Sequence, residues 1–373
     1  SAFNNQFGKP IATSDSYSAF GVTGGTNWDK LYLHDNATGN LIRTYTNPDP
    51  NEGWGYSNYL GSGGLALTET HIAAIRQEVR VQVFNTSSTA VLHTIEDAHV
   101  RRIALNDTYL AVAGYQGNAG ASSSGYVKIY NLSTGNLVTT LTSPGGAIAS
   151  EEYGMTLAMN NDYLVVGTGT GITHVIRTSD WGLVTSISSF SSTAGRRFLI
   201  GISDSHFAVG DGNQVKVYSV STGSLVRTIS APADAADDFG RAIQIVGNII
   251  IISDPAAGTG FGQSSYTGKV YFFEIDTGNK IAELTVGSQD SFGDGIGASS
   301  SGVVFIGAPA ESTNGGASGK IYRYQAPSLG TRTVTAENFV GVSDGAYASG
   351  ATATIQTAGA VDDAQSGLTA GQA

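Results

Sequence analysis

The chain has 373 residues, of which 50 are glycine, with a formal net charge of −11 and a charged content of only 13%. The acidic balance disfavours nucleic acid as a partner, because binding to a phosphate backbone needs clustered Lys and Arg for counterion release. The lack of cysteine excludes a disulfide framework, a thiolate nucleophile and a thiolate metal site.

One pattern of residues occurs seven times along the chain. It consists of an aromatic-Gly pair, a short apolar strand, a loop, a strand rich in Val, Ile and Tyr, a Thr-Gly turn and a closing apolar strand. The sixth copy is the most complete, with strands at 249–252, 268–273 and 281–284. An equivalent third-strand position recurs every 41 to 55 residues, at His34, Phe84, Tyr130, Arg177, Tyr218, Phe273 and Tyr324.

Repeats of this length are typical of propeller blades. A four-stranded unit cannot bury both of its faces alone and must stack against copies of itself. The sequence therefore predicts an all-β protein, with a seven-bladed β-propeller over residues 1–328.

The apolar residues occur in short runs bounded by Gly, Asn, Asp, Ser and Pro, which indicates strands and little helix. Second strands are expected at 109–114, 163–167, 206–210 and 303–307. Gly39, Gly135, Gly223 and Gly278 stand where a hairpin needs a positive φ. Blades two and four depart from this pattern at 87–89 and 180–182, so their hairpins should differ locally.

The motifs of several blades resemble a known family. Phe7-Gly8, Phe239-Gly240 and Phe292-Gly293, together with 268–271 and 307–309, are similar to FG-GAP repeats, which form seven-bladed propellers that include the head of integrin alpha chains. Many members of the family carry calcium in an Asp-x-Asp-x-Asp-Gly loop, where alternating carboxylates converge on one cation.

No such loop occurs in this chain. The nearest approaches are 49–53, 211–213 and Asp234 with 237–238, and ordinary turn chemistry explains them better than calcium. The six histidines form no close pair of the His-x-x-x-His kind. We therefore expect neither a metal site nor a cofactor.

The segment 329–373 differs in composition and is expected to form a small separate β module. The amino-acid sequence at 336–347 and 363–371 resembles a short module of structural proteins from tailed phages, particularly marine ones. The resemblance implies an assembly or attachment segment, and therefore a place in a virion.

Two motifs match sequence patterns of enzymes but lack the structural context that those patterns require. Residues 341–345 match Gly-x-Ser-x-Gly, but a nucleophile elbow needs a helix after the turn, and no helical pattern follows. Residues 167–171 resemble a phosphate cradle without a helix N-terminus behind it. We expect a protein that is not an enzyme.

Four cations share one position at the start of the innermost strand of their blades: Lys9, Arg102, Arg197 and Arg241. Met155 and Asp294 take that position in two other blades. Innermost strands surround the central channel, so these cations predict a basic, anion-attracting rim at one channel mouth. The alternative is that each cation pairs with an acidic inter-blade loop, such as 151–152 or 237–238.

These features predict a non-enzymatic virion structural or adhesion protein, such as a tail fibre, appendage or decoration. Its loops at 116–125, 256–267 and 310–318 would bind a host-surface glycan or protein. Other virion proteins are expected partners, with any oligomer formed through the C-terminal module. The longest apolar run, 243–252, is too short to enter a membrane as a helix. The alternatives are a secreted or cell-surface bacterial FG-GAP adhesion protein and, second, a propeller enzyme acting on glycans.

Overall fold

A computed structural model describes residues 6–23, 30–46, 64–76, 79–189, 200–210, 213–236, 238–256, 268–286, 291–311, 319–327, 341–343, 353–357 and 360–365. The chain divides into two compact units, Ser1–Pro327 and Ser328–Ala373. Every regular element of the described residues is a β-strand, as the sequence predicted. No helix within these ranges is long and apolar enough to cross a membrane.

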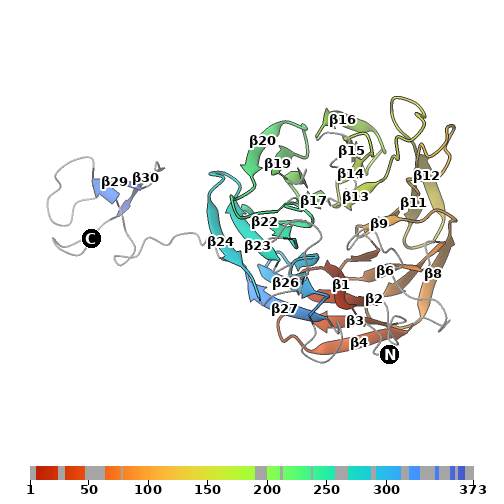
Figure 1. The fold of residues 1–373 in the computed structure, drawn as a ribbon, viewed down its shortest axis with the longest axis horizontal. Helices are drawn as coiled ribbons and strands as arrows, with labels where there is room; N and C mark the ends of the chain where they lie inside the picture. The colour runs from red at the N-terminus through yellow and green to blue at the C-terminus, as the bar shows by residue number, and fades with distance from the viewer. Residues whose placement is uncertain are drawn as a thin grey trace. The chain divides into compact units, whose positions relative to one another are not determined.

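The first unit is a seven-bladed β-propeller, as the repeat spacing predicted (Figure 1). Each blade is an antiparallel sheet whose strands follow one another in chain order from the channel outward. Blades one to three contain β1 (Gln6–Thr13), β2 (Tyr17–Thr23), β3 (Lys30–Asp35) and β4 (Leu41–Thr46); β5 (Leu65–Leu67), β6 (His71–Arg76), β7 (Arg80–Asn85) and β8 (Val91–Glu96); and β9 (Arg102–Leu105), β10 (Tyr109–Ala113), β11 (Val127–Asn131) and β12 (Leu137–Leu141).

Blades four to seven repeat the plan, and the described part of blade seven has three strands. They contain β13 (Thr156–Met159), β14 (Tyr163–Gly167), β15 (Ile172–Arg177) and β16 (Leu183–Ser188); β17 (Ile200–Ile202), β18 (His206–Gly210), β19 (Gln214–Ser219) and β20 (Leu225–Ser230); β21 (Ile243–Val246), β22 (Ile249–Asp254), β23 (Lys269–Glu274) and β24 (Lys280–Leu284); and β25 (Gly295–Ala298), β26 (Val303–Ala308) and β27 (Lys320–Gln325).

The hydrophobic core lies between the blades. Seven buried clusters each join one blade to the next, and the cluster of Ile11, Phe20, Val303 and Phe305 joins blade seven back to blade one. The Phe20 and Phe305 rings meet edge to face with centroids 5.3 Å apart. Burial of apolar area at every interface, including the closing one, stabilises a complete ring.

Glycines at the start of third strands allow close contact between blades. Gly125 and Gly319 form parallel bridges to Tyr153 and Phe7, the aromatic residues of the aromatic-Gly motifs at the start of the following blade. A Cβ on Gly319 would lie 2.2 Å from the Phe7 carbonyl oxygen, so only glycine fits where the last blade meets the first.

The hairpins of blades two and four differ from the others, as predicted. Gly39, Gly135, Gly223 and Gly278 have φ between +71° and +75°. In blade four the left-handed residue is Trp181, with φ +57°, and not Gly182. The bulged pair Ile176↔Leu183 matches Tyr130↔Leu137, so Ile176 is the true equivalent of Tyr130. The prediction that placed Arg177 there was wrong by one residue.

The second unit contains one antiparallel sheet of β28 (Gly341–Ser343), β29 (Ala353–Thr357) and β30 (Ala360–Gln365). The Ser of the Gly-x-Ser-x-Gly motif, Ser343, is the last residue of strand β28. Strand β29 is the middle strand of the sheet, so the expected small β module is present in this unit.

Candidate functional site

The aromatic-Gly motif sets the direction of the chain at the channel. Tyr153, Phe239 and Phe292 are fully buried. The glycines that follow the aromatic residues share one left-handed conformation, with φ of +99° at Gly8, +92° at Gly154, +92° at Gly240 and +95° at Gly293. This local geometry puts Lys9, Met155, Arg241 and Asp294 at equivalent places at the start of innermost strands, as the repeat alignment predicted.

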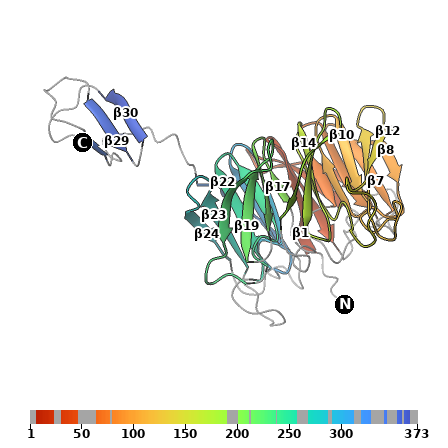
Figure 2. The same ribbon diagram turned by 90° about the horizontal axis from the view of Figure 1, so that it is seen from above.

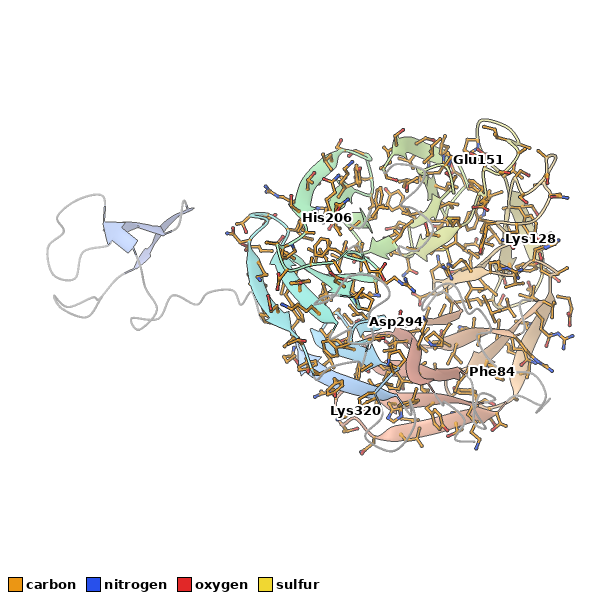
Figure 3. The ribbon with its side chains drawn as sticks, viewed as in Figure 1. Phe84, Lys128, Glu151, His206, Asp294 and Lys320 are labelled. Atoms are coloured by element: carbon orange, nitrogen blue, oxygen red, sulfur yellow. The ribbon has the colours of Figure 1, made fainter. Side chains whose placement is uncertain are left out.

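Lys9, Arg241 and Asp294 form one ion-pair cluster at the channel. Lys9 Nζ lies 2.7 Å from Asp294 Oδ2, and Arg241 Nη2 lies 3.6 Å from Asp294 Oδ1. Arg241 Nη1 is also 3.6 Å from Asp238 Oδ2. Figure 3 shows Asp294 near the middle of the ring, where strands from opposite ends of the chain meet. The cluster therefore joins blades six, seven and one.

Arg102 approaches the channel from blade three and is only 2% exposed. Its Nε donates a hydrogen bond to the Met155 carbonyl oxygen of the next blade, at 3.3 Å. Burial, with a smaller contribution from the positive charge of Arg241, lowers the pKa of Arg102 to about 10. Arg102 remains charged at neutral pH, and two guanidinium groups thus raise the positive potential of the channel.

The structure places three of the four predicted rim residues, while Arg197 lies outside the described residues. Arg241 makes the acidic-loop pair that the alternative anticipated, through Asp238. Glu151, in the other loop named above, accepts a hydrogen bond from Ser143 Oγ at 2.8 Å. The sequence interpretation missed Asp294 as a counter-ion, although the alignment had placed this residue in the same ring position.

Arg241 keeps one donor without an acceptor. Its Nε is buried and has no hydrogen-bond partner within the described ranges. The Arg241–carboxylate distances of 3.6 Å are long for charge-assisted hydrogen bonds. The two carboxylates therefore do not fully satisfy the donors of the Arg241 guanidinium group.

A loop beside this channel mouth is rigidly held. Residues 116–125 follow β10, whose last residue Ala113 pairs with Arg102. The backbone N–H groups of Ser150, Glu152 and Tyr153 donate to the Ser122, Ser123 and Ser124 carbonyl oxygens at 2.8, 3.0 and 2.9 Å. The predicted loops at 256–267 and 310–318 lie almost entirely outside the described residues. We name this end of the propeller, with the second-to-third-strand loops and the starts of the innermost strands, the loop face.

The near-calcium sequences do not assemble a metal site in the part of the chain that the structure describes, where no three His, Asp or Glu side chains converge suitably. Residues 49–53, 211–212 and 237 lie outside that part. Asp234 lies within it and forms an ion pair with Lys269, which also contacts Glu283 Oε1 at 3.0 Å.

Known structures share the fold at low sequence identity. The WD40 domain of Neurospora crassa Pan2 matches with a TM-score of 0.58 and 11% identity over 86% of this chain and 89% of that one. Hsv2 of Kluyveromyces lactis, with complete loop 6CD, matches with a TM-score of 0.53 and 12% identity over 86% of this chain and 100% of that one. The computationally designed Ika8 protein matches with a TM-score of 0.52 and 15% identity, over 86% and 97%.

These likenesses show the β-propeller fold alone, a fold consistent with a protein-interaction scaffold. No protein-family model matches the chain. No curated protein matches it either. The FG-GAP and phage resemblances therefore stay predictions.

Proposed function

We propose that the protein is a non-enzymatic virion structural or adhesion protein, which presents the loop face of its propeller to a glycan or protein on the host surface. The observation that supports this most is a closed ring, packed at all seven interfaces, with a polar loop held by backbone hydrogen bonds beside the channel mouth where Lys9, Arg102 and Arg241 lie. Recognition commonly uses loops on a rigid scaffold, since a fixed loop loses little entropy on binding.

The virion role is proposed because the sequence at 336–347 and 363–371 resembles a module of phage structural proteins. In this proposal the second unit attaches the propeller to other virion proteins, and the protein acts outside the cell on the particle. Quantitative mass spectrometry of purified particles tests it: we expect a fixed copy number per particle. Recovery from a bacterial cell envelope, with none on particles, would contradict the virion role and support the secreted-adhesin alternative.

The proposed ligand of the loop face is an anionic glycan, because Lys9, Arg102 and Arg241 bring positive charge to the channel mouth. The test measures binding to sulfated and sialylated glycans and to their neutral counterparts. Arg241→Gln should weaken binding of the anionic glycans about tenfold, a loss of about 1.4 kcal/mol.

Lys280→Gln is the matched control, because Lys280 is an exposed cation at the start of β24, directly after the third-to-fourth-strand hairpin and at the end of its blade away from the loop face. It should bind as the wild type does. Equal binding of charged and neutral glycans, or equal losses in both variants, would remove the basic rim from the proposal. Turnover of any glycan during the assay would favour the enzyme alternative.

A further inference from the structure

Blades one to five expose aliphatic side chains at the start of their outermost strands. Nine of the ten large hydrophobic side chains that are exposed within the described ranges belong to this set, which we name the aliphatic arc. Its members are Leu41 53%, Ile42 42%, Val91 40%, Leu92 38%, Leu137 51%, Val138 45%, Leu183 45%, Leu225 55% and Val226 38% exposed. Repetition at one structural position sets them apart from scattered surface hydrophobics.

The arc lies at the end of the blades opposite the loop face. In each blade the turn between the first two strands is bonded to the start of the third-to-fourth hairpin. Examples are Asn36 N–H to the Ser16 carbonyl oxygen at 2.8 Å and Leu132 N–H to that of Thr108 at 2.9 Å. The outermost strands β4, β8, β12, β16 and β20 begin directly after these hairpins, on the perimeter of the ring (Figures 1 and 2). We name this end the turn face.

Acidic residues occupy the first-to-second-strand turns of the same five blades. They are Asp15, Glu69, Asp107, Asp162 and Asp204, and all five are exposed. The corresponding turns of blades six and seven contain Gly247-Asn248 and Ser300-Ser301, and β24 begins with Lys280. The aliphatic arc and the acidic turns therefore cover the same five blades of the turn face, and neither continues in the described residues of blades six and seven.

Several basic side chains of the turn face already bond to acceptors in the propeller. Arg43 Nε donates to the Thr86 carbonyl oxygen and Arg227 Nε to that of Ile275, both at 3.0 Å. His93 Nε2 lies 2.7 Å from the Leu132 carbonyl oxygen. Arg177 pairs with Asp180 at 2.9 Å in the blade-four hairpin. The turn face thus offers aliphatic contacts beside acidic charge.

Charge determines which occupant fits. A second copy docked by the same face would bring five more acids against these five, in a chain with 30 acidic and 19 basic residues. Like charges across an interface oppose association, whereas complementary charges favour it. Aliphatic contacts near a charged rim are typical of protein interfaces.

We propose that the turn face of blades one to five docks a partner protein whose contact surface combines aliphatic side chains with Lys or Arg. The surface is separate from the loop face, so one protein can bind partners at both ends. The inference does not depend on the virion role, because its features are side chains of the propeller itself.

The test uses two synthetic probes of equal length, an amphipathic Leu/Lys peptide and a Leu/Glu peptide, titrated into the full chain by calorimetry. We expect binding of the Leu/Lys peptide only. The aliphatic variant, Leu137→Ser with Val138→Thr, Leu225→Ser and Val226→Thr, should weaken binding at least about tenfold. The acid variant, Asp107→Asn with Asp204→Asn, should weaken it and reduce its salt dependence.

Ile148→Ser is the matched control, because Ile148 is 53% exposed but precedes β13 on the loop face. It should bind as the wild type does. Unchanged melting temperatures confirm that the exposed substitutions leave the ring folded. Equal binding of both peptides, or equal weakening in the control, would overturn the proposal. Concentration-dependent self-association in sedimentation, lost in the aliphatic variant, would identify a second copy as the occupant and also overturn it.

Discussion

Gly125 shows how a single residue sets the distance between two blades. Its φ is +79°, and a Cβ there would lie 2.2 Å from the Tyr153 carbonyl oxygen and 2.4 Å from the Tyr153 nitrogen. Gly268 faces Phe292 in the same way, with the nearest backbone oxygen 2.3 Å from the added Cβ. Backbone cannot move aside as a flexible side chain can, so a larger residue must separate the blades.

Replacing Gly125 with Ala should therefore destabilise the propeller by about 3 kcal/mol, because left-handed strain and overpacking add. Gly39→Ala is the control: Gly39 has φ +75° and nothing within 4 Å of the added Cβ. Gly39→Ala should lower the free energy of unfolding by about 1 kcal/mol, because it adds only the strain of a left-handed backbone conformation. Urea unfolding measures both free energies, and equal losses would show that the contact with Tyr153 costs nothing.

Asp254 is a buried acid whose charge opposes folding. It is 0% exposed, its Oδ2 accepts a hydrogen bond from Ala236 N–H at 2.5 Å, and its Oδ1 has no partner within the described ranges. Burial, with smaller contributions from the negative charges of Asp238 and Asp234, raises the pKa of Asp254 to about 6. The folded state thus holds this proton more tightly than the unfolded chain does.

The contribution of Asp254 to stability should therefore fall as the pH rises. The stabilising contribution of protonated Asp254 is complete below the ordinary pKa of 3.8, declines as the pH rises towards 6, and is lost above that. Asp254→Asn removes the charge and keeps an acceptor for Ala236. The free energy of unfolding of the variant should exceed that of the wild type by about 2 kcal/mol at roughly pH 8, and by little or nothing at roughly pH 4. Urea unfolding at both values checks this, and a pH-independent difference would contradict it.

At the scale of the element, runs of apolar residues predicted the bounds of the seven strands given above to within a residue or two. They give local evidence, since a buried strand needs consecutive Val, Ile and Leu wherever it lies in the ring. The hairpin of blade four was misplaced because its left-handed residue, Trp181, is stabilised by a tertiary contact. The Trp181 ring meets the Tyr109 ring edge to face at 5.0 Å. A turn prediction based on the position of glycine in the local sequence cannot include that tertiary contact.

Blade seven closes the ring with a third strand that resembles an outermost one. The burial pattern of β27 is that of β16, whereas third strands such as β23 have four consecutive buried residues. Arg323 Nη2 donates to the Asn36 carbonyl oxygen of blade one at 2.8 Å. Arg43 and Arg227 make the equivalent bond to the next blade from outermost strands. An arginine on the third strand thus takes this role at the closure.

At the scale of the whole molecule, ring closure decides how charges combine. The sequence alone predicted that Lys9, Arg102 and Arg241 lie at innermost strands, because equivalent positions of a repeat are equivalent in space. It could not predict that Lys9 pairs with Asp294, 285 residues away, because that contact exists only once blade seven packs on blade one. Pairing of cations with carboxylates across the channel is a property of the closed ring.

Asp294 therefore limits how strongly the channel attracts anions, and Asp294→Asn tests this directly. Removing the shared carboxylate leaves Lys9 and Arg241 near Arg102 in a partly buried channel, so the variant should lose about 2 kcal/mol of stability. Sulfate should raise its melting temperature more than that of the wild type, because an anion that binds the folded channel replaces the lost carboxylate. Chloride at equal ionic strength is the control for screening.

Asp180→Asn provides the matched variant, since Asp180 pairs with Arg177 in an exposed hairpin where solvent screens the charges. Its response to sulfate should equal that of the wild type. If Asp294→Asn also responds as the wild type does, then the positive potential of Lys9, Arg102 and Arg241 does not concentrate anions. The channel cations would then serve only to join the blades, and binding of anionic glycans would have to use the loops alone.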